Sequence, residues 1–316
     1  MKPYVVYTPD YDIHFGGLEK LHPFDTRKYS RAYEEARKRL GAALAQATLI
    51  PPGQVSDDDL RLVHTREYLE SLKSVQVLVQ ALEFPPLALF PYGMIEQHLL
   101  RPMRLATMGT LMAARAALHH RLLLNLSGGY HHASASKGEG FTIFSDIALA
   151  IIKLRREGLL AEHDGVLIID LDAHQGNGYA RIFRDDATIT IFDMYNGSIY
   201  PMDGYARKRI NYDLPLPPGC ADQQYLLTLK AELPRALEAA QAKLAFYVAG
   251  TDIYERDMLG GLRVTEEAIF DRDSYVLNRL AEADIPFVML PAGGYSADSY
   301  RFIARTLCYL FERWGG

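Results

Sequence analysis

Short apolar runs alternate with longer segments of helical pattern along the chain. The runs are rich in Val, Ile, Leu and aromatic residues, and they lie at 4–8, 122–127, 165–172, 187–194, 244–250 and 286–293. Patterns that predict helices fall between them, at 101–120, 145–158 and 222–244, and Pro234 predicts a kink or break in the last. Nearly continuous apolar strands separated by helices predict an α/β fold, with a mostly parallel sheet covered by helices on both faces.

Three proline-rich stretches interrupt this pattern, at 49–53, 83–93 and 213–219. Each is too short to be a linker between domains, so each predicts a loop. We therefore expect residues 1–316 to form a single domain with long loops on one side of the sheet.

Composition narrows the class of protein. The chain is 49% hydrophobic and 23% charged, which is typical of a protein with a large buried core. A formal net charge of −5 supports no nucleic-acid partner. The two cysteines, Cys220 and Cys308, lie far apart and predict neither a disulfide framework nor a thiolate zinc site. Because no run reaches about 18 apolar residues, we expect no membrane span and a cytoplasmic protein.

Polar and glycine-rich clusters follow four of the predicted strands, at the point where each strand ends. They are GGYHHA (128–133), LDAHQGNG (171–178), TDIYERD (251–257) and GGYS (293–296). Ligand sites of open parallel α/β sheets lie at the carboxyl ends of the strands. The four clusters are therefore expected to converge on one site.

The pair Asp172 and His174 is a candidate metal site. Residues two apart in an extended segment point to the same side, so a carboxylate oxygen and an imidazole nitrogen can reach one ion. Asp252, at the equivalent place after another strand, is a candidate third ligand, and this set leaves a coordination position open as in catalytic zinc sites. The alternative is that both aspartates only cap helices at strand-to-helix turns.

Four further residues are candidates for acid–base or electrostatic chemistry. The adjacent His131 and His132 could act as general base and acid, although such a pair could equally be one exposed and one buried histidine. The Tyr295 hydroxyl could polarise a substrate carbonyl, or Gly-Gly-Tyr could be only a loop. Asp170 could orient a histidine, or it could bond backbone amides or a monovalent cation.

In this order and spacing, the motifs resemble those of the zinc-dependent histone deacetylases, which have the arginase/deacetylase fold. The chain is most similar to the small, single-domain class IV branch, and the resemblance runs from about residue 10 to the C-terminus. It includes GEGF (138–141), AGTDIYERDMLGGL (249–262), GLEKLHPFDTRKY (17–29), LVHTREYL (62–69) and YNGSIYPMD (195–203). It implies a single catalytic domain with its active site at the carboxyl ends of the strands.

The resemblance also implies a role for each matching position. One Zn²⁺ per chain would be bound by Asp172, His174 and Asp252. The catalytic residues would be His131, His132, Tyr295, Asp170 and Asn177, with Asp170 paired to His131. The substrate-binding residues would be Gly140 and Phe141, the latter as one aromatic wall of the tunnel for the acyl-lysine side chain. A K⁺ ion would bind near Asp170.

The implied reaction is hydrolysis of an Nε-acyl-lysine amide, in a protein or peptide, to lysine and a carboxylate. Zinc would activate water and polarise the carbonyl, and Tyr295 would support the oxyanion. His132 would take the proton of the water and later protonate the leaving amine.

Two positions depart from the pattern of many class I enzymes. Asn177 stands where those enzymes have an aspartate, and we hypothesise that the missing charge leaves His132 more readily neutral. The rim loop 83–93 has no aspartate to grip a peptide backbone, so it could favour a long acyl chain or a small-molecule amide instead.

Three other functions share parts of this pattern. Arginase-like enzymes use a second metal-binding carboxylate after Asp-Ala-His, whereas Gln175 and Gly176 follow here. Deacetylation of acetylated polyamines or other small amines is the main alternative, and Glu83 alone is weak support for it. A non-catalytic acyl-lysine binder is disfavoured because every expected ligand and catalytic position is occupied by a matching residue.

Overall fold

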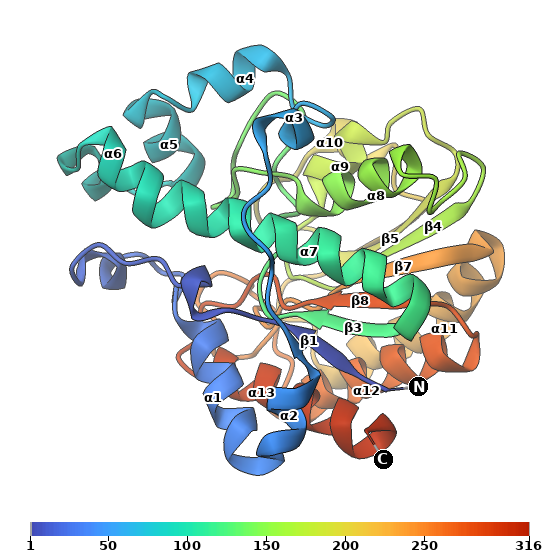
Figure 1. The fold of residues 1–316 in the computed structure, drawn as a ribbon. Helices are drawn as coiled ribbons and strands as arrows, with labels where there is room; N and C mark the ends of the chain where they lie inside the picture. Colours follow the sequence, from blue (N-terminus) through green and yellow to red (C-terminus); the bar gives the residue numbers. More distant parts are fainter. Residues whose placement is uncertain (1, 316) are drawn as a thin grey trace.

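The computed structural model describes residues 2–315, which are built around an eight-stranded sheet (Figure 1). The strands are β1 Tyr4–Val6, β2 Thr48–Leu49, β3 Leu122–Asn125, β4 Gly165–Asp170, β5 Ile189–Asn196, β6 Tyr212–Leu216, β7 Ala242–Val248 and β8 Phe287–Leu290. The α-helices are α1 Lys28–Leu40, α2 Ala42–Ala47, α3 Asp57–Leu60, α4 Arg66–Ser71, α5 Val75–Leu82, α6 Tyr92–Ile95, α7 Arg101–His120, α8 Asp146–Arg156, α9 Asn177–Ile182, α10 Gly204–Arg207, α11 Asp222–Ala240, α12 Glu266–Glu282 and α13 Ser299–Trp314. Short 3-10 helices span Pro9–Tyr11, Leu18–Leu21 and Pro85–Leu89, and a π-helical turn spans Glu96–Leu100.

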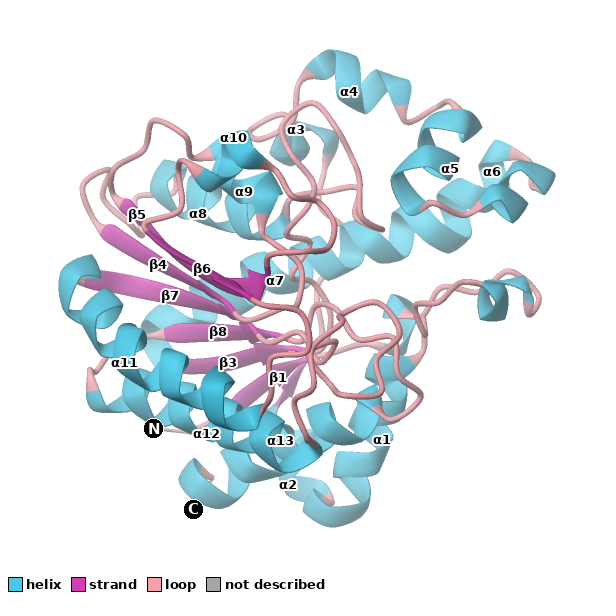
Figure 2. Cartoon of the chain, turned by 180° about the vertical axis from the view of Figure 1, so that it is seen from behind, coloured by secondary structure: helices cyan, strands magenta, loops and turns pink. Residues whose placement is uncertain are grey.

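The strands pair in parallel throughout, in the order β2-β1-β3-β8-β7-β4-β5-β6. At the end of β4, Asp170 lies beside Asp193 of β5 and Val248 of β7. Because parallel neighbours run in one direction, their carboxyl ends reach the same edge of the sheet, and long loops emerge there (Figure 2). The predicted α/β architecture is confirmed.

Helices cover both faces of the sheet, with α7 and α8 on one side and α11, α12 and α13 on the other (Figure 1). Alternate residues of a strand pack against the helices on opposite faces of the sheet, because successive side chains of a strand point to opposite faces. In β4, Leu167 and Ile169 belong to the core shared with α11 to α13, whereas Val166 and Ile168 pack with α7 and α8. All four are fully buried, which explains why the run is apolar without interruption. Within residues 2–315, none of the helices is both long enough and apolar enough for a membrane crossing.

The apolar pattern predicts six of the eight strands, and 101–120 matches the bounds of α7. The pattern did not predict β2 and β6. β6 also corrects a prediction, because it occupies most of the proline-rich stretch 213–219, which was expected to be a loop. β6 is an edge strand with no further strand on its outer side. Pro215 has no backbone N–H, and on that side no neighbouring strand needs one. The loop predicted at 83–93 likewise contains the 3-10 helix Pro85–Leu89.

Pro234 was predicted to cause a kink or a break, and the break is wrong, since α11 continues through it. A proline inside a helix removes one backbone hydrogen bond and crowds the preceding turn. Here Leu229, Leu233 and Leu237 are buried along the same face of α11, and this packing holds the helix against the sheet across the proline.

Candidate metal centre and active site

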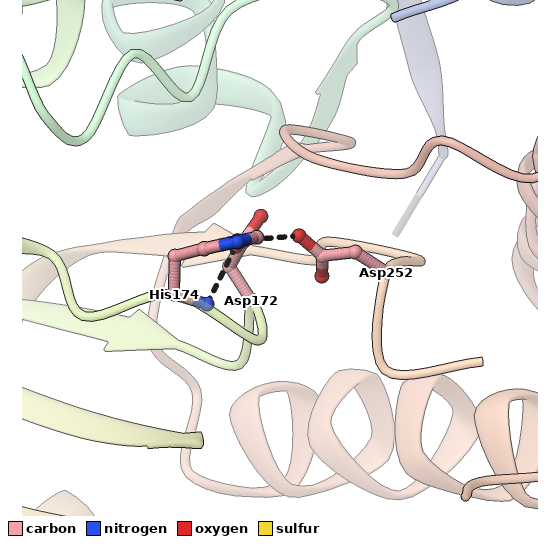
Figure 3. Close-up of side chains that lie close together, drawn as sticks. All are labelled: Asp172, His174 and Asp252. Carbon is pink, nitrogen blue, oxygen red and sulfur yellow. Dashed lines mark hydrogen bonds and ion pairs between the residues drawn. The ribbon is translucent and has the colours of Figure 1, made fainter. Parts of the chain in front are cut away.

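Asp172, His174 and Asp252 form a buried cluster at the carboxyl edge of the sheet (Figure 3). His174 Nδ1 lies 3.1 Å from Asp172 Oδ1 and 3.0 Å from Asp252 Oδ2. Each residue offers one ligand atom, and these atoms lie within 4.8 Å of one another. Asp172 and His174 follow β4 and Asp252 follows β7, so the two strands carry the three side chains to one point, as expected from the sequence.

Backbone amides hold the second oxygen of each carboxylate. Gly293 N donates to Asp172 Oδ2 at 2.9 Å, and Ala173 N donates to Asp252 Oδ1 at 2.8 Å. A side chain at Gly293 would be excluded, because its Cβ would lie 2.3 Å from Asp252 Oδ2 and 2.4 Å from Asp172 Oδ2. The orientation of the two carboxylates is therefore fixed by the main chain around them.

The charge of the cluster suits a cation. Burial by itself lowers the pKa of His174, but the hydrogen bonds and charges of Asp172 and Asp252 outweigh burial and raise that pKa to about 10. Two fully buried carboxylates thus need positive charge between them, which a proton on His174 supplies here. Two carboxylates and an imidazole are also a donor set that zinc accepts, so the residues fit a bound Zn²⁺.

His131 is paired with a carboxylate. Its Nδ1 lies 2.9 Å from Asp170 Oδ2, and Tyr179 Oη donates to the same oxygen at 2.6 Å. Burial lowers the pKa of His131, but Asp170 and Asp172 outweigh it and raise the pKa to about 9. The environment of His131 therefore favours the charged imidazolium.

His132 has the opposite environment. Its Nδ1 lies 2.8 Å from Asn177 Oδ1, and Asn177 Nδ2 donates to Glu139 Oε1 at 2.9 Å. Burial holds the pKa of His132 well below its usual range, and the neighbouring His131 and His174 lower it further. His132 is therefore neutral at physiological pH. Glu139 lies within the motif GEGF (138–141), but the sequence assigned it no role, and the fold brings it to Asn177.

Tyr295 lies over the cluster on the loop that follows β8. Its ring centroid is 6.0 Å from that of His174 and 5.8 Å from that of Phe141. Asp257 Oδ2 accepts from Tyr295 N at 2.7 Å, which anchors the loop from one side. Burial and the nearby Asp252 and Asp172 charges raise the pKa of the Tyr295 phenol well above 10, so it stays protonated and can donate a hydrogen bond.

Lys28, at the start of α1, anchors the same loop from the other side. Its Nζ donates to the carbonyl oxygens of Ala292 at 2.6 Å, Gly293 at 3.0 Å and Gly294 at 3.4 Å. The side chain is fully buried, and burial lowers the pKa of Lys28 to about 8. Lys28 lies within the motif 17–29, but a lysine at the start of a helix is ordinarily exposed, and the motif assigned it no role.

Aromatic side chains stand around the cluster. Phe141 packs edge-on against His22 at 4.5 Å between ring centroids, and Tyr200 packs against His132 at 5.2 Å. Gly140 makes the approach of this loop to His132 feasible, because a Cβ there would lie 2.3 Å from His132 Cδ2. Phe141 and Gly140 were expected here, whereas Tyr200 was missed because only its place in the fold brings it to His132.

An apolar cavity of about 100 Å³ lies beside this site. Where it meets the site, its lining includes His131, Gly293, Tyr295 and Phe141. Farther away, the lining includes Ile13, Phe15, Phe84, Leu87, Leu99 and Met103. Because one water molecule needs only about 10–15 Å³ of such volume, the cavity has room for a group of several heavy atoms.

Comparisons with known proteins agree with the fold and the motifs. The histone deacetylase domain family matches residues 22–310. Histone deacetylase 2 of Arabidopsis thaliana is 39% identical over 307 residues, which cover 96% of this chain and 77% of that protein. Acetoin utilization protein AcuC of Staphylococcus aureus is 26% identical over 315 residues, which cover 92% of this chain and 76% of that protein. A crystal structure of an HDAC homologue complexed with SAHA shares the fold, with a TM-score of 0.75, 22% identity and coverage of 100% of this chain and 84% of that chain.

The parallel sheet and its layers are those of the arginase/deacetylase fold, and the family match supports a hydrolase. The chain belongs to the histone deacetylase family. The narrower likeness to class IV stays a prediction.

Proposed function

We propose that this protein is a zinc-dependent deacylase that hydrolyses Nε-acyl-lysine to lysine and a carboxylate. The observation that carries the proposal is the meeting of three features: the buried Asp172–His174–Asp252 cluster, the paired histidines beside it, and an apolar cavity whose lining includes His131 and Tyr295. The three cluster residues would hold the zinc ion, whose chemistry is to activate water and to polarise the substrate carbonyl.

The protein's own residues handle the protons. His132 is neutral and bonded through Nδ1 to Asn177, so its Nε2 is free to accept a proton from the attacking water and to return it to the leaving amine. His131 is held charged by Asp170 and adds positive charge next to the reacting centre. The Tyr295 hydroxyl donates to the carbonyl oxygen as negative charge develops on it.

The cavity supports acyl groups longer than acetyl. The substrate lysine would pass between Phe141 and Tyr200, which would put its carbonyl at the cluster and its acyl group in the cavity. The far lining residues, such as Leu99 and Met103, are buried and apolar, so an alkyl chain would leave water for an apolar surface.

A small acylated amine, such as an acetylated polyamine, is the alternative substrate. It would need free carboxylates at the rim, and Glu139 does not supply one, because its oxygens bond Asn177 and pair with Lys137. Glu83 is a second rim carboxylate near Tyr200 and the remaining support for this alternative. Acyl-lysine is therefore the favoured substrate class.

We further propose a monovalent cation, such as K⁺, between Asp170 and Asp193. The two carboxylates belong to paired residues of β4 and β5 and are fully buried, and Asp193 Oδ1 has no hydrogen-bond partner within the described chain. A buried carboxylate oxygen without a partner is costly, and a cation would remove that cost. The expected result is a higher melting temperature in KCl than in N-methylglucamine chloride of equal ionic strength, lost in Asp193→Asn. Equal melting temperatures in the two salts would remove this proposal.

The direct test of the function is metal removal and return. Chelation should abolish hydrolysis of an acyl-lysine peptide, one equivalent of zinc should restore it, and Tyr295→Phe should be strongly impaired. Tyr205→Phe, which changes an exposed tyrosine outside the site, is the matched control and should keep full activity. A protein that binds the peptide but releases no lysine under any of these conditions would be a binder and not an enzyme.

A further inference from the structure

Glu139 extends the hydrogen-bond chain of His132 by one residue beyond Asn177. His132 and Asn177 are buried, and the Glu139 side chain is only 17% exposed. The distances along the chain are 2.8 Å from His132 Nδ1 to Asn177 Oδ1 and 2.9 Å from Asn177 Nδ2 to Glu139 Oε1. The chain of contacts thus ends on a carboxylate even though Asn177 itself is neutral.

The carboxylate decides which way the Asn177 amide points. The oxygen and nitrogen of an amide are nearly the same in size, so its orientation follows from its partners. An ionised carboxylate can only accept hydrogen bonds, so Glu139 must face the NH₂ group of Asn177. The Asn177 oxygen then faces His132, and His132 Nδ1 must carry a proton in order to donate to it.

We propose that Glu139 is a positioning residue that sets the tautomer of His132 through Asn177. With the proton on Nδ1, the lone pair is on Nε2, the nitrogen available to accept a proton. The inference rests on the proposed function only in giving His132 the role of a base. It also modifies the expectation from the sequence. The negative charge missing at Asn177 is supplied by Glu139, the next residue along the hydrogen-bond chain.

The loop that carries Glu139 is built to hold it there. Thr142 binds the Glu139 carbonyl oxygen twice, through N at 3.0 Å and through Oγ1 at 2.8 Å. Gly140 lets the loop approach the face of His132. Lys137 pairs with Glu139 Oε2, which leaves Oε1 for Asn177. The pairing with Asn177 is therefore part of a fixed arrangement and not a surface contact.

The first test reads the tautomer directly and needs no substrate. Long-range ¹H–¹⁵N correlation spectra of the zinc-loaded protein at pH 7.5 distinguish Nδ1–H from Nε2–H imidazoles, and loss of a signal in His132→Gln assigns it. Wild type should show Nδ1–H at His132, and Glu139→Gln should show both tautomers, because a glutamine can present either its oxygen or its nitrogen to Asn177. Glu162→Gln changes an exposed glutamate outside the site and should leave the tautomer unchanged. A wild-type His132 in the Nε2–H form, or an unchanged tautomer in Glu139→Gln, would overturn the proposal.

The second test uses kinetics. Glu139→Gln should lower kcat about tenfold with KM little changed, a part of the roughly 10⁴-fold that a wrong histidine tautomer can cost in a hydrolase. A purely structural role predicts wild-type kcat instead, since glutamine can accept the same bond from Asn177. Asn177→Asp would place a second carboxylate against that of Glu139 and should also be impaired. The double variant Asn177→Asp with Glu139→Gln has a single carboxylate again and should recover activity. Failure of that recovery would contradict the proposal, while absence of any deacylase activity would remove the proposed function and leave the tautomer test standing.

Discussion

The floor of the site, formed by Asp172, His174 and Asp252, and its rim, formed by Phe141 and Tyr200, are built differently. The two floor aspartates are fully buried, and the floor directly follows two adjacent strands of the sheet, with backbone amides on its carboxylates. The rim comes from loops, and Tyr200 remains 38% exposed. The floor therefore depends on the sheet and is suited to one chemistry, whereas the rim depends on contacts between distant loops and is suited to selecting a substrate.

A change in the floor should have the largest effect. Asp252→Asn removes one charge from the cluster, and we expect loss of bound zinc and a fall in kcat/KM of about 10³-fold or more, because even the outer partners of a metal site cost roughly 10–100-fold. Metal content per chain and steady-state kinetics would measure both. Asp271→Asn, an exposed aspartate on α12, should keep its metal. A metal-loaded, active Asp252→Asn protein would show that the cluster is not the metal site.

The next effect is expected where rim and floor meet. Tyr295→Phe removes only a hydroxyl, so we expect kcat to fall about 10²–10³-fold as for the loss of one oxyanion donor, with little change in KM. Steady-state kinetics on one acyl-lysine peptide would measure it. A change confined to KM would indicate that Tyr295 only binds substrate.

The same contrast explains what could be predicted from the sequence. Asp172, His174 and Asp252 follow apolar strands directly, so the pattern that predicts the strands also predicts where these side chains meet. Glu139 and Lys28 lie within the motifs 138–141 and 17–29, but they act through partners 38 and more than 260 residues away, and the motifs do not reveal these contacts. The edge strand β6 was missed for a related reason, since a proline-rich segment becomes a strand only through its pairing with β5.

His64, between α3 and α4, is hydrogen-bonded to the segment that contains Ser134 and Ser145. Because it is buried, it should make the stability of the fold depend on pH. Its Nδ1 lies 3.0 Å from the Ser134 carbonyl oxygen, and Ser145 N donates to its Nε2 at 3.1 Å. Burial lowers the pKa of His64 from 6.5 to about 4. Between these two pH values His64 binds a proton in the unfolded chain but not in the folded chain. Stability should therefore fall as pH drops from 6.5 toward 4, by about 2 kcal/mol between pH 7 and pH 5.

Urea unfolding of wild type and His64→Gln at pH 7 and pH 5 isolates this contribution. The variant has no group to titrate at this position, so its free energy of unfolding should fall by about 2 kcal/mol less than that of wild type over the same interval. An equal fall in both proteins would show that His64 is protonated in the folded state.

The smallest effect is expected in the cavity, and it should change selectivity and not chemistry. Met103→Phe adds volume to the far lining, so we expect the ratio of kcat/KM for a myristoyl-lysine peptide to that for an acetyl-lysine peptide to fall about tenfold. Met108→Phe, on the same helix but outside the cavity lining, is the control and should leave the ratio unchanged. An unchanged ratio in Met103→Phe would place the acyl chain elsewhere.

The central claim is that the floor hydrolyses an acyl-lysine amide while the cavity receives the acyl group. The most direct measurement is kcat/KM of the zinc-loaded enzyme for acetyl-, octanoyl- and myristoyl-lysine peptides and for acetylated polyamines, with released amine and carboxylate quantified together. We predict equal amounts of the two products from the peptides, a higher kcat/KM for the longer acyl groups, and little hydrolysis of the polyamines. Hydrolysis of the polyamines alone, or of none of these compounds, would contradict the claim.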